Sequence, residues 1–154
     1  MYSDCGVEIP KRQTIDSAGY DFYMPYDMTL EPGKWYTIDT GIMLEENEVM
    51  ETTFYMYLNG EWETVTIRPA QWVMKLYARS GLGNRNIFRF ANGTGIIDQD
   101  YVGKHIMAKV AVDEPLILKK GDRYMQGIIC PTCYSINEVI PTRERTGGHG
   151  STGQ

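Results

Sequence analysis

The chain has 154 residues, a formal net charge of −5 and a pI of about 5.0. This length suits one domain that buries roughly two-thirds of its unfolded surface. The acidic balance argues against general nucleic-acid binding, and no apolar run reaches the roughly 18 residues of a membrane span. Because the N-terminus has no basic region followed by an apolar stretch, we expect no signal peptide and a cytoplasmic location, in the host cell if the protein is virus-encoded.

Short apolar runs, broken by Gly, Pro, Asn and Asp, follow one another along the chain. Many are rich in the β-branched and aromatic residues that strands favour. Asn59-Gly60 lies between two such runs and predicts a two-residue hairpin. No long amphipathic helix is indicated, and at most one or two helical turns follow Ser80. The sequence predicts an all-β sandwich or barrel, with strands at 35–38, 52–58, 64–67, 72–76, 106–112, 116–118 and 124–129.

The three cysteines, Cys5, Cys130 and Cys133, are an odd number, which argues against a disulfide framework. Cys130 and Cys133 have the C-x-x-C spacing of a redox pair or of half a zinc site. A second ligand pair is missing, however, and no βαβ pattern surrounds them. We therefore interpret them as half-buried strand thiols.

The last thirteen residues contain no aliphatic side chain and combine glycines and hydroxyl groups with two arginines and one histidine. Glycine lets a backbone close around an anion, and hydroxyl, peptide N–H and guanidinium groups donate to phosphate oxygens. This segment is either a frayed polar terminus or an arm that orders on a phosphorylated ligand. We predict a β domain over residues 1–141 and a flexible arm over residues 142–154 that closes over the active site.

Five short segments stand out between residue 15 and the C-terminus. They are Ala18-Gly19-Tyr20-Asp21, Arg79-Ser80-Gly81-Leu82-Gly83, the run 95–103, Gly121-Asp122-Arg123-Tyr124-Met125-Gln126, and the glycine-rich run 147–153. Each is weak alone, but the five in this order resemble the trimeric deoxyuridine triphosphatase (dUTPase) family. The resemblance implies a distorted jelly-roll subunit and a homotrimer with active sites at subunit contacts. It also implies Mg²⁺-dependent hydrolysis of dUTP to dUMP and pyrophosphate.

An aspartate on a tight turn between two glycines can project into a cleft and accept a proton from water. The resemblance implies that Asp98 orients the water that attacks the α-phosphorus and also touches the sugar 3′-hydroxyl. It implies that Tyr101 lies flat against the deoxyribose and leaves no room for a 2′-hydroxyl. Ser80 would face the bond that breaks, and Gln126 would bond to a phosphate oxygen. Taken alone, Asp98 reads as a turn residue and Tyr101 as a core ring.

Arg79-Ser80-Gly81 supplies a guanidinium, a hydroxyl and N–H groups, which are the components of a phosphate cradle. Asn92 lies in a short hairpin that, by the resemblance, reads uracil largely through its backbone. It reads equally well as a simple turn residue. The neighbouring Gly95 and Ile97 complete the expected substrate contacts in this part of the chain.

The arm departs from the family at two places. His149 stands where most members have a phenylalanine stacked on uracil, so we expect weaker and pH-sensitive closure. The family's arginine has no unique counterpart, and either Arg143 or Arg145 fills that role. The resemblance places the other arm contacts at Gly150, Ser151 and Thr152, with the two hydroxyl side chains capping the γ-phosphate.

Asp21 follows Tyr20 and has no cationic neighbour in the sequence. By the resemblance it holds Mg²⁺ through metal-bound water, the usual habit of this ion at phosphates. The alternative interpretation is that Asp21 is a solvated surface carboxylate without a functional role. Arg123 is expected to brace the site by pairing with a carboxylate rather than to bind phosphate.

Residues 45–69, which include the Asn59-Gly60 hairpin, exceed what the family commonly carries before its Arg-Ser-Gly loop. They read as a decorative surface hairpin or as a docking surface for another protein, with the aromatic residues as anchors. Two alternatives to dUTP hydrolysis stay open. One is a dCTP deaminase or bifunctional relative, although no separate carboxylate for that chemistry is visible. The other is a regulatory protein that senses the nucleotide.

Overall fold

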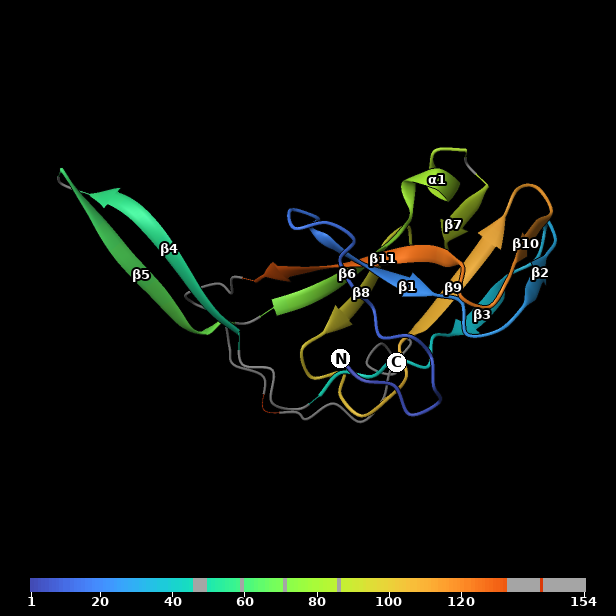
Figure 1. The fold of residues 1–154 in the computed structure, drawn as a ribbon, viewed down its shortest axis with the longest axis horizontal. Helices are drawn as coiled ribbons and strands as arrows, with labels where there is room; N and C mark the ends of the chain where they lie inside the picture. The colour runs from blue at the N-terminus through green and yellow to red at the C-terminus, as the bar shows by residue number, and fades with distance from the viewer. Residues whose placement is uncertain (46–49, 59, 71, 86, 133–141, 143–154) are drawn as a thin grey trace.

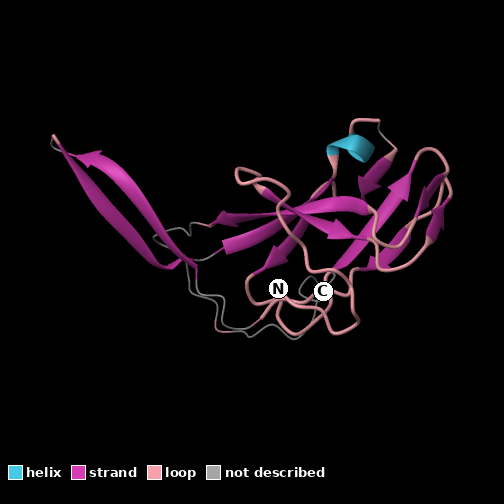
Figure 2. Cartoon of the chain, in the orientation of Figure 1, coloured by secondary structure: helices cyan, strands magenta, loops and turns pink. Residues whose placement is uncertain are grey.

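The computed structural model describes residues 1–45, 50–58, 60–70, 72–85, 87–132 and 142. The described part is almost entirely β-structure, as Figures 1 and 2 show. This confirms the predicted all-β class. The elements are β1 (Gly19–Tyr23), β2 (Met28–Leu30), β3 (Tyr36–Asp39), β4 (Met50–Leu58), β5 (Glu61–Ala70), β6 (Trp72–Ala78), α1 (Ser80–Gly83), β7 (Phe88–Phe90), β8 (Gly95–Asp98), β9 (Met107–Val112), β10 (Leu116–Leu118) and β11 (Arg123–Pro131).

Two antiparallel sheets enclose the core. The larger has the strand order β1-β11-β6-β8, and the smaller has the order β3-β9-β7. A two-stranded sheet of β2 and β10 lies beyond them (Figure 1). Buried side chains from both sheets form one hydrophobic cluster, so the domain is a β-sandwich of the jelly-roll type. Its largest fully buried residues include Tyr124, Phe22, Met74, Ile38 and Val110.

Alternation along the strands of the larger sheet decides which side chains face the core. In β6, Trp72, Met74 and Leu76 are buried, and the residues between them are half-buried. In β8, Ile97 is buried while Ile96 and Asp98 are exposed. Because successive side chains of a strand point to opposite faces, burying Ile97 turns the Asp98 carboxylate outward.

β4 and β5 form a separate two-stranded hairpin that projects from the body of the molecule (Figure 1). Leu58 pairs with Glu61 across the connection, and Gly60 has a φ of 90°. This positive φ is the conformation that a two-residue hairpin turn needs, so the hairpin predicted at Asn59-Gly60 is confirmed. β5 ends at Ala70 and β6 begins at Trp72, so the hairpin is joined directly in sequence to the first residue of a central strand.

The seven predicted strands overlap β3, β4, β5, β6, β9, β10 and β11, and α1 is the helical turn expected after Ser80. Four strands were missed: β1, β2, β7 and β8. Each has three to five residues and includes a polar residue or glycine, so none shows the uninterrupted apolar run by which the equally short β10 was recognised. In the described part, α1 is the one α-helix, and at four residues it falls far short of a bilayer span. Cys130 lies half-buried on β11 as expected, and Cys133 is outside the described residues.

Candidate active site

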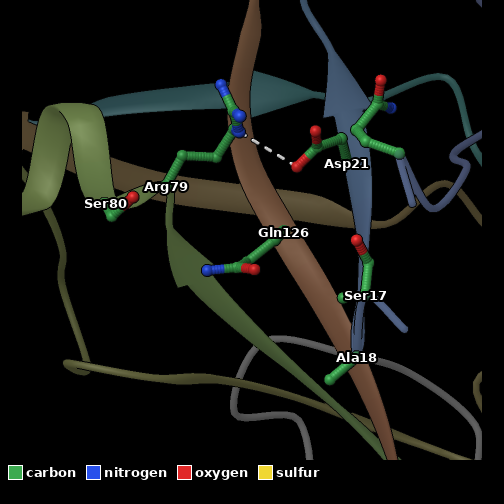
Figure 3. A pocket seen from close by; sticks show the side chains of 8 residues that line it. Ser17, Ala18, Asp21, Arg79, Ser80 and Gln126 are labelled. Atoms are coloured by element: carbon green, nitrogen blue, oxygen red, sulfur yellow. Dashed lines mark hydrogen bonds and ion pairs between the residues drawn. The ribbon is translucent and has the colours of Figure 1, made fainter. Parts of the chain in front are cut away.

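A cleft of about 280 Å³ opens where β1, β11 and the end of β6 meet. Its polar groups come from three of the five sequence segments, and from the loop that precedes β1. Figure 3 shows the side chains gathered around it. The lining residues are Gln13, Ser17, Ala18, Gly19, Asp21, Arg79, Ser80 and Gln126.

Asp21 is the charged centre of this cleft. It is only 6% exposed, and each of its carboxylate oxygens accepts a hydrogen bond from a different arginine. Arg79 Nε donates to Oδ1 at 3.0 Å, and Arg123 Nη1 donates to Oδ2 at 3.2 Å. The expected pairing of Arg123 with a carboxylate is confirmed. Two guanidinium groups and one carboxylate give this part of the cleft a net positive charge, which favours an anionic ligand.

Strand register explains how Gln126 reaches the cleft. Asp21 lies opposite Gln126 in the pairing of β1 with β11, and Gly19 is two residues before Asp21 on the same face of β1. A Cβ on Gly19 would lie 2.6 Å from Gln126 Oε1. The absence of a side chain at Gly19 is therefore what lets the Gln126 amide lie across β1 into the cleft.

Replacing Gly19 by alanine should displace the Gln126 side chain without unfolding the protein. The added methyl group would meet the flexible end of a glutamine, which can swing away at small cost to stability. For the dUTP hydrolysis that the resemblance implies, we expect turnover to fall about tenfold, with a melting temperature close to that of the wild type. Steady-state kinetics and thermal denaturation measure the two effects. Unchanged kinetics in Gly19→Ala would mean that Gln126 has no role in this cleft.

Arg79 and Ser80 lie where β6 ends and α1 begins. The Arg79 N–H donates to the Tyr124 carbonyl at 3.2 Å, and its carbonyl accepts from Leu82 N and Gly83 N. These bonds fix the backbone on both sides of the guanidinium. Ser80 is exposed at the cleft. The N–H groups of Ser80 and Gly81 belong to the first turn of α1, where helix geometry supplies no carbonyl acceptor.

The structure separates Asp98 from this cleft. Asp98 pairs with Val73 on β6, and Arg79 follows six residues later along the same run of chain. At about 3.3 Å per residue, this places Asp98 roughly 20 Å from the Arg79 end of the strand. The predicted catalytic residues therefore form two groups within one chain: Ser80 and Gln126 in the cleft, and Asp98 at the far end of β8.

Tyr101 lies on the Asp98 side, whereas Asn92 precedes Gly95, which pairs with Leu76 toward the Arg79 end of β6. Tyr101 is 9% exposed and part of the hydrophobic core. Its N–H donates to the Asp98 carbonyl at 3.0 Å, and its hydroxyl donates to the His105 carbonyl at 2.9 Å. Asn92 is exposed in the turn before β8, which begins at Gly95. Ile97 points into the core, so its backbone is the part left for a ligand.

Sequence reasoning missed two lining residues, Gln13 and Ser17. They lie in the polar run just before the first motif, and that adjacency was the one signal available. Gln13 Nε2 donates to Tyr23 Oη at 3.0 Å, and the Thr14 and Ser17 hydroxyls bond to each other at 2.6 Å. The expected arm contacts lie outside the described residues: Arg143, Arg145, His149, Gly150, Ser151 and Thr152.

Three comparisons show which family this chain resembles. A family model described as dUTPase matches residues 6–54. The deoxyuridine 5′-triphosphate nucleotidohydrolase of Lactococcus lactis is 31% identical over 160 residues, which cover 99% of this chain and 92% of the relative. The relative from Desulfitobacterium hafniense strain DCB-2, with the same name, is 30% identical over 157 residues, covering 97% and 90%.

A solved dUTPase structure from Streptococcus mutans aligns with a TM-score of 0.59 and 25% identity, over 82% of this chain and 88% of that chain. A point mutant of the dUTPase from phage phi11 of S. aureus, described with a structural Mg(II) ion, aligns with a TM-score of 0.62. It is 17% identical and covers 90% of this chain and 92% of its own, so it shows the fold alone. With near-complete coverage at 31% identity, and the same fold, this chain belongs to the dUTPase family.

Proposed function

We propose that this protein hydrolyses dUTP to dUMP and pyrophosphate by attack of an oriented water on the α-phosphorus. The proposal depends above all on the cleft that gathers Asp21, Arg79, Ser80 and Gln126 in a chain of this family. These groups come from three distant segments of the sequence. Together they present a guanidinium, a hydroxyl and an amide to an anion.

The active site of the proposed enzyme is completed by another copy of the chain. The roughly 20 Å of strand between Asp98 and Arg79 supports this, because one α-phosphorus cannot meet both residues of one subunit. Asp98 is exposed, on the outward face of β8 beside Ile96, which is 51% exposed. We propose a homotrimer in which Asp98 and Tyr101 of one subunit face the cleft of a second. The arm, residues 142–154, would then close over the bound nucleotide.

Each residue has a defined task in this proposal. Asp98 holds the attacking water and accepts its proton. Ser80, with the first-turn N–H groups of α1, donates to the oxygen between the α- and β-phosphorus as negative charge develops there. Arg79 uses Nε toward Asp21, and a guanidinium has four further N–H donors for phosphate oxygens. Gln126 donates its amide to a phosphate oxygen from the opposite wall.

The residues of the cleft fit a Mg²⁺ ion held through water. Among the described residues no group of three His, Cys, Asp or Glu side chains could hold a metal ion directly. Mg²⁺ at a nucleotide commonly uses one or two carboxylates, the phosphates and several waters. Asp21 fits the carboxylate role, because an ionised carboxylate has about four acceptor sites and the arginines occupy two. When bound, the ion would neutralise charge on the triphosphate.

Pyrophosphate release measured with dUTP, dTTP, dCTP and UTP, with and without Mg²⁺, tests the proposal. We expect release from dUTP with Mg²⁺ and at least about a hundredfold less from UTP. The enzyme must reject the added 2′-hydroxyl by steric exclusion at Tyr101, which discriminates strongly only if the site is rigid. Formation of dUTP from dCTP would instead support the deaminase alternative. Tight binding of a non-hydrolysable dUTP analogue without turnover would support a regulatory protein, with the β4–β5 hairpin as its contact surface.

A further inference from the structure

His105 lies between two carboxylates from distant parts of the chain. Its Nδ1 is 2.8 Å from Asp39 Oδ1, and its Nε2 is 2.9 Å from Asp4 Oδ1. Asp39 ends β3, Asp4 belongs to the N-terminal segment, and His105 lies in the loop between β8 and β9. The next residue, Ile106, donates its N–H to the Ile42 carbonyl at 2.8 Å. We call Asp4, Asp39 and His105 the His105 cluster.

Both ring nitrogens face acceptors, and an imidazole can donate from both only when it is protonated. The hydrogen bonds to Asp39 and Asp4 raise the pKa of His105 to about 9. Burial works to raise the pKa of Asp39, but the bonds from His105 and the Gly41 N–H outweigh it and lower that pKa. The cluster is thus an imidazolium held between two ionised carboxylates at neutral pH.

The His105 cluster connects directly to Tyr101. The His105 carbonyl accepts the Tyr101 hydroxyl at 2.9 Å, and the Tyr101 N–H bonds to the Asp98 carbonyl at 3.0 Å. Tyr101 is therefore held at both ends, by the residue proposed to orient the water and by the residue at the centre of the cluster. A shift of the 105 backbone would move the Tyr101 ring relative to Asp98.

We propose that His105 is a positioning residue, which acts through its carbonyl to fix the Tyr101 ring and with it the selection of deoxyribose over ribose. This inference rests on the proposed function, because it takes Tyr101 as the sugar contact. In this proposal, His105 makes no contact with the substrate. The ion pairs hold the loop, the loop holds the hydroxyl of Tyr101, and the ring excludes a 2′-hydroxyl.

The pH dependence has a definite sign. The folded-state pKa of His105 lies above its usual value of about 6.5, so the cluster stabilises the loop fully below pH 6.5 and loses its effect as pH rises through about 9. At the acid end the effect is lost as Asp39, whose pKa is lowered, becomes protonated. Asp4 and Asp39 are the charged groups that the described structure places against the ring, and Lys104 precedes it on its own loop.

The test compares His105→Gln, which cannot carry the charge, with His105→Arg, which keeps a cation able to donate to both carboxylates. Asp4→Asn removes one partner at a site that is 57% exposed, so folding should be unaffected. Lys104→Gln is the matched control, an exposed charge on the same loop outside the cluster. Hydrogen exchange of the Tyr101 amide and the ratio of kcat/KM for dUTP over UTP are measured at pH 7 and pH 10.

At pH 7, the Tyr101 amide should exchange its hydrogen about tenfold faster in His105→Gln than in the wild type. The ratio of kcat/KM for dUTP over UTP should fall roughly threefold to tenfold. Asp4→Asn should show a smaller change, His105→Arg should restore part of it, and Lys104→Gln should match the wild type. The difference between wild type and His105→Gln should shrink at pH 10. The inference is overturned if the Tyr101 amide of His105→Gln exchanges at the wild-type rate. It is also overturned if that amide exchanges faster while the dUTP-over-UTP ratio stays at the wild-type value. If the wild type leaves dUTP intact, the proposed function fails, and exchange still tests the His105 cluster by itself.

Discussion

Replacing Asp98 by asparagine should reduce turnover of dUTP by about 10²- to 10⁴-fold. The amide keeps the shape of the carboxylate but cannot accept a proton from water. Because Asp98 is exposed and its backbone is paired with Val73, neither folding nor assembly should depend on its charge. Pyrophosphate release measures turnover. Calorimetric titration with a non-hydrolysable dUTP analogue should show affinity near that of the wild type.

Asp100→Asn provides the matched control, because it removes an exposed carboxylate two residues further along the same turn. Its turnover should stay within about twofold of the wild type.

Mixing two inactive variants tests whether the active site is shared between subunits. Asp98→Asn and Arg79→Ala, each inactive alone, should regain part of the activity when their subunits exchange, because some sites then receive both native residues. Failure to recover activity after verified exchange would place both residues in one subunit's site, against the separation along β6.

Replacing Asp21 by asparagine should both destabilise the fold and disable the site. The carboxylate accepts from Arg79 and Arg123, so its neutral analogue leaves two guanidinium groups close together without a counter-charge. Breaking a buried ion pair typically costs 3–5 kcal/mol, and the arginines here are about a third exposed, so we expect a loss of about 2 kcal/mol. Urea denaturation measures this loss, and pyrophosphate release measures the fall in activity.

Arg123→Gln separates the two roles of Asp21. It removes one arm of the brace but keeps the carboxylate, so stability should fall while the Mg²⁺ concentration for half-maximal activity stays unchanged. Asp21→Asn should raise that concentration severalfold, since the proposed water-mediated contact is lost. Equal Mg²⁺ requirements in the two variants would leave Asp21 with a purely structural role.

The sequence predicted the fold class and the motif residues that line the cleft, but neither Gln13 and Ser17 nor the distance between Asp98 and the cleft. Five motifs in a fixed order were enough to select Asp21, Arg79, Ser80 and Gln126. The separation of Asp98 depends on the register of β8 against β6, and β8 has too few residues to give a periodic signal.

Contacts between residues distant in sequence were the least accessible from the residues alone. Asp21 has no cationic neighbour in the sequence, yet Arg79, 58 positions away, donates a hydrogen bond to it. His105 gave no signal at all, since its two partners are 66 and 101 positions distant. Such groups come into contact only in the folded chain, and no local sequence pattern predicts the contact.

The β4–β5 hairpin enters the domain at the Trp72 end of β6, and the cleft lies at the other end, beside Arg79. The hairpin forms a sheet of its own, so none of the ladders of the larger sheet depends on it. Changes in the length or composition of this hairpin would therefore leave the pairing of the larger sheet intact. They would fall next to Val73, however, whose strand partner is Asp98, so this appendage and the carboxylate proposed to orient the water are not free to evolve independently.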